Sequence, residues 1–236
     1  MLKYSKDPCR DANRILEAHP EMAILRHLKR AACLGSLDRL EYFYQNSREQ
    51  LASTCSKLLD ELSIERISTL SRSSAVIECL RRSSVSEIMI SESRPGLEGL
   101  ETAKLLSAEG FKVTLVVDAL LPWLSRKLGF WGIVGADMVT KTHLINKIGT
   151  FPLALAVKTI AVPGLLKLCE CEHEIRRRPP EEVAELRGVN VVNIYFDETP
   201  LSHLYKLVFE GFYLDPSEIE KAFERLRVLL GNTPPA

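Results

Sequence analysis

The sequence predicts an α/β fold: a Rossmann-like, mostly parallel sheet with helices on both faces, preceded by a small helical region. From Asp7 to about Leu62, apolar residues recur every three or four positions, which is the period of amphipathic helices. After Glu65, short apolar runs alternate with helical patterns, which is typical of βαβ units. We therefore expect a helical N-terminal region over residues 1–63 and a Rossmann-like domain over residues 64–236.

Pro20 and the Gly35-Ser36 pair divide the helical region, and residues 36–61 are expected to form one long amphipathic helix. Strands are predicted at residues 66–70, 87–91, 112–117, 132–135, 162–167 and 191–195. Helices are predicted between and after them at residues 74–82, 100–109, 120–128, 151–159, 201–209 and 216–230.

Composition restricts the function. Of 236 residues, 46% are hydrophobic and 26% are charged, as in ordinary globular proteins. Lys plus Arg and Asp plus Glu are equal at 31 each, so the chain lacks the excess positive charge that dominates non-specific nucleic-acid binding, and no specific nucleic-acid binding is evident. No apolar run approaches the length of a membrane span, and the first residues lack the apolar core of a signal peptide. We expect a cytoplasmic protein without a membrane partner.

Six cysteines are scattered along the chain without a CxxC pair, and a chain of this size does not need disulfides, so we expect reduced thiols. Cys169 and Cys171 lie close to His173, but their spacing differs from that of zinc ribbons and fingers. We expect no metal and no cofactor.

Ligands of such sheets bind beyond the carboxyl ends of the strands, and the segments that follow the predicted strands are polar. Arg72 and Ser73 follow the first strand, and Arg94 follows the second within an Arg-Pro-Gly turn. A guanidinium at a strand end can bind a phosphate through two hydrogen bonds, although a surface ion pair is the alternative. Asp137 follows the apolar strand GIVGA, as a general base, a hydroxyl anchor or a simple cap.

Residues 146–150 lead directly into the apolar helix FPLALAVKTI. Gly149 lets the backbone approach a ligand, Lys147 supplies positive charge, and free N–H groups at a helix start favour anions. This segment is predicted to be an anion site, with an ordinary helix cap as the alternative.

The ordered blocks ESRP, VTLVVDA, GAD and NKIGT resemble the initiation factor 2B alpha, beta and delta subunit family. That family includes ribose-1,5-bisphosphate isomerase and methylthioribose-1-phosphate isomerase. The resemblance implies a helical domain before a Rossmann-like domain that binds a phosphorylated ligand, assembled as a homodimer or larger homo-oligomer. Its isomerases convert an aldose into a ketose with a cysteine after the first strand and the aspartate of GAD. By this resemblance Asp137, Arg94, Asn146 and Lys147 match the family's site residues.

The cysteine is replaced in this chain by Ser71, whose hydroxyl is a poor acid and base near neutral pH. The leading hypothesis is a subunit that binds a sugar phosphate or nucleotide without isomerising it, with a role in translation initiation or ligand sensing. Its partners would be translation initiation factor 2 or sister subunits. The alternatives are an active aldose-ketose isomerase and a structural subunit with an empty cleft. The candidate catalytic residues are Asp137 and Ser71, and the candidate ligand residues are Arg94, Asn146, Lys147, Gly149, Thr150, Arg72 and Ser73.

Overall fold

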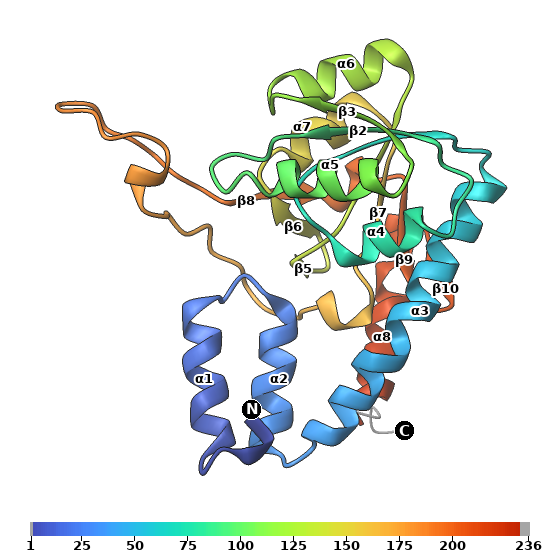
Figure 1. The fold of residues 1–236 in the computed structure, drawn as a ribbon. Helices are drawn as coiled ribbons and strands as arrows, with labels where there is room; N and C mark the ends of the chain where they lie inside the picture. Colours follow the sequence, from blue (N-terminus) through green and yellow to red (C-terminus); the bar gives the residue numbers. More distant parts are fainter. Residues whose placement is uncertain (1, 232–236) are drawn as a thin grey trace.

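A seven-stranded sheet forms the centre of the protein, whose structure, a computed structural model, describes residues 2–231 (Figure 1). Its strand order is β10-β9-β7-β4-β1-β2-β3. All neighbours pair in parallel except β9 and β10, which form an antiparallel edge. The strands are β1 (Arg66–Thr69), β2 (Glu87–Ser91), β3 (Lys112–Val116), β4 (Trp131–Val134), β7 (Thr159–Ala161), β9 (Lys206–Phe209) and β10 (Phe212–Leu214).

Two hydrophobic cores lie on opposite faces of this sheet, because successive strand residues point to opposite sides. Ile133 faces one core and Val134 the other, and Ile88 and Met89 divide in the same way. One face is covered by α4 (Ser74–Leu80) and α5 (Glu98–Ala108), and the other by α6 (Leu120–Leu128), α7 (Thr150–Ala156) and α8 (Ile219–Leu229). The predicted fold class, a mostly parallel sheet with helices on both faces, is confirmed.

Three helices precede the sheet: α1 (Pro8–Ala18), α2 (Ala23–Cys33) and the long α3 (Leu37–Glu61). The first two pack side by side below the sheet in Figure 1, and α3 runs from them up to the sheet. Leu51, Leu58 and Leu59 of α3 pack into the same core as α4. The division at residues 63 and 64 stays a prediction, and residues 1 and 232–236 of the predicted regions lie outside the described residues.

A second, antiparallel sheet of three strands was not predicted. It contains β5 (Met138–Val139), β6 (His143–Lys147) and β8 (Phe196–Pro200) in the order β5-β6-β8. Its first strand begins directly after Asp137, so this sheet lies against the carboxyl ends of the main strands. Lys147, the last residue of β6, pairs with Phe196, the first residue of β8.

Three predicted elements of the C-terminal half are wrong. The strand expected at residues 162–167 lies earlier, at β7, because Pro163 and Gly164 end it, and residues 165–167 form a 3-10 turn. The strand expected at residues 191–195 is irregular, and β8 follows it instead. The helix expected at residues 201–209 is a 3-10 turn followed by β9, since a short apolar run fits both periods.

The expectation of reduced thiols is also wrong, because all six cysteines form disulfides. Their pairs are Cys9 with Cys33, Cys55 with Cys79, and Cys169 with Cys171. The first two pairs each join neighbouring helices, α1 to α2 and α3 to α4. We expected reduced thiols from the spacing of the cysteines and the size of the chain. Neither shows which thiols the packing of the helices brings together.

In the part of the chain from residue 2 to residue 231, no helix has both the length and the apolar character to cross a bilayer.

Candidate functional site

The loops that follow β1, β2 and β3 are joined by hydrogen bonds at the carboxyl edge of the sheet. The backbone N–H of Ser71 donates to Oγ of Ser93 over 2.7 Å. The N–H groups of Ser93 and Arg94 each donate to a different oxygen of the Asp118 carboxylate, both over 2.8 Å. Ser71 and Ser93 have φ values of 62° and 65°, so both loops turn sharply. These bonds fix the positions from which the candidate side chains extend.

Glu98, the first residue of α5, links two of the predicted site residues. Its Oε1 accepts a hydrogen bond from the Ser71 hydroxyl over 2.9 Å and lies 2.8 Å from Nζ of Lys147. The helix start is pressed against β2, because a Cβ at Gly99 would lie 1.9 Å from the Ser91 carbonyl oxygen. Only glycine lets α5 begin here and bring Glu98 to this point.

Lys147, the last residue of β6, is a buried cation. Its side chain is only 7% exposed, while that of Glu98 is 28% exposed. The Tyr195 ring lies 5.3 Å from Nζ, within the range of a cation–π contact. A Cβ at Gly96 would lie 3.9 Å from the same nitrogen, so the Arg-Pro-Gly turn adjoins Lys147. The structure therefore brings Ser71, Lys147 and this turn together around Glu98.

Asp137 lies within electrostatic range of the same group. Burial raises its pKa above the ordinary value, and the Glu98 carboxylate acts in the same direction, whereas the ammonium groups of Lys167 and Lys147 oppose the rise. Burial lowers the pKa of Lys167, and the charge of Asp137 opposes that change. Asp137 and Lys167 are thus a half-buried acid and base whose pKa values are moved toward each other.

The start of α7 already holds an internal anion. The N–H groups of Gly149 and Phe151 donate to Oδ2 of Asp197 over 2.8 and 3.1 Å. Burial raises the pKa of Asp197 to about 6, although these hydrogen bonds act against the rise. A ligand anion at this helix start would have to displace Asp197.

Asn146 and Thr150 are buried and support the turn between β6 and α7. The amide of Asn146 donates to the Thr150 hydroxyl over 2.9 Å, and that hydroxyl donates to the Lys147 carbonyl over 2.7 Å. Both side chains therefore use hydrogen bonds to hold Lys147 in place.

The remaining predicted ligand residues lie at the rim. Ser73 caps α4 by accepting a hydrogen bond from the N–H of Val76 over 3.4 Å. Arg72 and Arg94 are exposed. Among residues 2–231, neither guanidinium has a hydrogen-bond or ion-pair partner. Both remain predicted phosphate contacts.

Four residues at or near the group around Lys147 were not predicted from the sequence: Glu98, Lys167, Tyr195 and Asp197. Glu98 follows the ESRP block by three positions and precedes the helix predicted at residues 100–109, so a signal for it was present. The other three come from segments whose structure was predicted wrongly.

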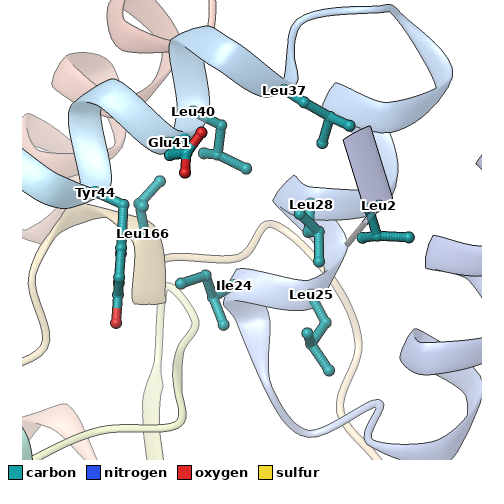
Figure 2. A pocket seen from close by; sticks show the side chains of 9 residues that line it. All are labelled: Leu2, Ile24, Leu25, Leu28, Leu37, Leu40, Glu41, Tyr44 and Leu166. Carbon is teal, nitrogen blue, oxygen red and sulfur yellow. The ribbon is translucent and has the colours of Figure 1, made fainter. Parts of the chain in front are cut away.

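A separate cavity of about 440 Å³ lies between α2 and α3. Figure 2 shows that leucine and isoleucine side chains make up most of its wall, with Glu41 and Tyr44 at one side. An apolar wall does not suit a phosphate, so the polar cluster at the strand ends is the better candidate site.

The fold and the polar cluster define an α/β protein whose candidate site lies at the carboxyl ends of a mostly parallel sheet. The sequence pattern of the Initiation factor 2 subunit family matches residues 29–211. The chain belongs to this family, and the resemblance found in its motifs is confirmed.

Relatives in this family carry two kinds of name. The putative translation initiation factor eIF-2B subunit 2-like protein of Pyrococcus furiosus is 33% identical over 228 residues, covering 87% of this chain and 80% of the relative. The ribose 1,5-bisphosphate isomerase of Archaeoglobus fulgidus is 36% identical over 141 residues, covering 52% of this chain and 44% of that protein. The crystal structure of the Pyrococcus horikoshii translation initiation factor eIF-2B superposes with a TM-score of 0.72 at 25% identity, covering 92% of this chain and 85% of that one.

Proposed function

We propose that this protein is an initiation factor 2B-like subunit that binds a phosphorylated small molecule, a sugar phosphate or a nucleotide, and does not isomerise it. The observation that supports this most directly is the Ser71–Glu98–Lys147 cluster. A serine stands where the resembling isomerases have their cysteine, and its proton is donated to a carboxylate. A thiol of pKa about 8.5 exchanges protons near neutral pH far more readily than this hydroxyl.

The charge arrangement favours a phosphate as ligand. Lys147 is nearly buried and pairs with one carboxylate, that of Glu98. A phosphate carries more charge and more acceptor oxygens than this carboxylate. Arg72 and Arg94 lie on the adjacent loops and can bind phosphate oxygens in pairs. Binding would therefore exchange an internal ion pair for a pair with the ligand.

The names of the relatives support a role in translation initiation. Proteins named as initiation factor 2B subunits cover most of this chain, whereas the isomerase match covers about half of it. We propose a cytoplasmic role in translation initiation or ligand sensing, with translation initiation factor 2, sister subunits or further copies of this chain as partners.

Ligand binding is tested by thermal unfolding with ribose 1,5-bisphosphate, nucleoside monophosphates and inorganic phosphate, each added separately. A ligand at one hundred times its dissociation constant stabilises the native state by about 2.7 kcal/mol, which raises the melting temperature measurably. The proposal expects a shift with at least one phosphorylated ligand, lost in Lys147→Met and retained in the control Lys104→Met, whose side chain is exposed. No shift with any of them would support a structural subunit with an empty cleft.

The second candidate is an aldose-ketose isomerase of a phosphorylated pentose such as ribose 1,5-bisphosphate, an intramolecular oxidoreductase. The Asp137–Lys167 pair favours it, because an acid and a base with opposed pKa shifts are what proton transfer requires. Formation of ketose from ribose 1,5-bisphosphate separates the two candidates. Turnover that disappears in Asp137→Asn would establish the isomerase and overturn the non-catalytic proposal.

A further inference from the structure

Cys169 and Cys171 form a disulfide across a single intervening residue, where the segment after β7 meets β5. The backbone N–H of Cys169 donates to the Val139 carbonyl over 2.8 Å. Sγ of Cys171 lies 3.6 Å from Sδ of Met138, the first residue of β5. Contacts other than the disulfide itself therefore hold both cysteines in place.

A small molecule can reach this disulfide from a surface cavity. The cavity has a volume of about 630 Å³, and Cys169 and Cys171 both line it. Cys169 is 7% exposed, whereas Cys171 is half-buried. Cys55 and Cys79, in contrast, are each 0% exposed. Because exchange requires direct contact between a thiolate and a disulfide sulfur, the pair at the cavity is open to it and the buried pair is not.

Opening the Cys169–Cys171 bond should change the stability of the fold little. A disulfide stabilises mainly by restricting the unfolded chain, and this effect grows with the length of the closed loop. The two cysteines are 2 residues apart, whereas the partners in the other two disulfides are 24 apart. The unfolding equilibrium should therefore change about 20-fold less than on opening one of the longer loops. The folded protein can hold this pair as a disulfide or as two thiols.

The cavity carries an excess of negative charge. Glu170 on its wall is compensated, because it lies 3.3 Å from Nζ of Lys141 and also pairs with Arg227. Glu172 and Glu198 lie on the same wall, and neither has an ion-pair partner among residues 2–231. A cleft with net negative charge attracts cations and repels anions. It therefore favours a cationic thiol over an anionic one.

We propose that Cys169 and Cys171 form a thiol–disulfide exchange site for small cationic thiols, the aminothiols. The incoming thiolate attacks Sγ of Cys171, the more exposed sulfur, and forms a mixed disulfide with it. The bond to Cys169 breaks, and Cys169 leaves as a thiolate that takes up the proton lost by the incoming thiol. His143 lies on the cavity wall, and an imidazole is well suited to carry this proton.

A second aminothiol completes the exchange. Its thiolate attacks the small-molecule sulfur of the mixed disulfide, and Cys171 leaves as a thiolate that is then protonated. Two aminothiols are thus oxidised to one disulfide, and the protein disulfide is reduced to two thiols. The proposal is independent of which ligand binds at the strand ends.

Single variants of the full chain test which sulfur is attacked. Cys169→Ser leaves only the Cys171 thiol of this pair, and Cys171→Ser leaves only that of Cys169. With cystamine, a cationic disulfide, mass spectrometry should show a mixed disulfide forming about 10-fold faster in Cys169→Ser, because access controls the rate. An unchanged melting temperature shows that each variant is folded. Equal rates, or faster reaction of Cys171→Ser, would overturn the assignment.

The charge of the reagent tests the class of thiol. At about 10 mM salt, Cys169→Ser should react about 10-fold faster with cystamine than with the anionic disulfide dithiodiglycolate. Adding Glu172→Gln and Glu198→Gln should remove most of this preference. Glu185→Gln, an exposed site outside the cavity, should leave it unchanged. A preference that survives the loss of both cavity carboxylates would contradict the cationic class.

The oxidised wild type tests the exchange itself. After treatment with cysteamine and alkylation of the released thiols, peptide mapping should find Cys169 and Cys171 modified while Cys55–Cys79 stays closed. The protein should keep its circular dichroism spectrum. A Cys169–Cys171 bond that resists cysteamine, or that opens only when the protein unfolds, would overturn the proposal.

Discussion

Removing the carboxylate that pairs with Lys147 should weaken the fold and strengthen ligand binding. The change Glu98→Gln keeps the size of the side chain and an acceptor for the Ser71 hydroxyl, but removes the charge 2.8 Å from Nζ. Breaking a fully buried ion pair costs about 3–5 kcal/mol, and the 28% exposure of Glu98 reduces this to roughly 2 kcal/mol. The free energy of unfolding, measured in urea, should fall by that amount.

The same change should favour a phosphate at Lys147, because the ligand no longer competes with Glu98. If separating the pair costs the ligand roughly 1.4–2 kcal/mol, Glu98→Gln should bind ribose 1,5-bisphosphate about 10- to 30-fold more tightly by calorimetry. Glu101→Gln is the matched control, since its pair with Lys104 on the same helix is exposed and contributes little. Unchanged or weaker ligand binding in Glu98→Gln would refute the competition.

Three further changes test other parts of the structure. The pKa of about 6 for Asp197 means that this group stabilises the fold below pH 4, and that the contribution is lost as the pH rises through 6. The stability of the wild type relative to Asp197→Asn should therefore fall by about 3 kcal/mol between these pH values in urea titrations, and a constant difference would contradict this. Replacing Cys55 by serine opens the bond to Cys79, 24 residues away, and should lower the stability of the oxidised protein by about 3 kcal/mol; equal stability would argue against the disulfide. Gly99→Ala places a methyl group 1.9 Å from the Ser91 carbonyl and should cost about 1–3 kcal/mol by denaturation, whereas a gain in stability would contradict the close contact.

Local patterns were sufficient for the elements that keep one period over their whole length. The long helix α3 and the strands β1, β2 and β4 were predicted within about one residue of their bounds. Their apolar residues form a regular pattern over the whole element, because each element packs against a core on one face or on both. The prediction for residues 201–209 was wrong because a run of nine residues with six apolar positions fits both a helix and a strand. The β5–β6 hairpin was missed because its turn, Thr140 to Thr142, lacks the glycine or asparagine that usually signals one.

The candidate site was predictable only in part. Residues that follow a strand directly, such as Ser71 and Asp137, could be identified from the strand pattern alone. Tyr195 and Asp197 reach the site through the second sheet, whose pairing depends on contacts between segments about fifty residues apart. Such pairing leaves little trace in the local sequence, and neither does the choice of Glu98 as the partner of Lys147.

The account depends most on Lys147 as the residue that receives a ligand phosphate. Isothermal titration of ribose 1,5-bisphosphate into the wild type and into Lys147→Met, compared at equal protein concentration, tests this directly. The account predicts heat of binding in the wild type and none in the variant, with the injected sugar recovered as the aldose. Equal binding by both proteins, or recovery of the ketose, would contradict it.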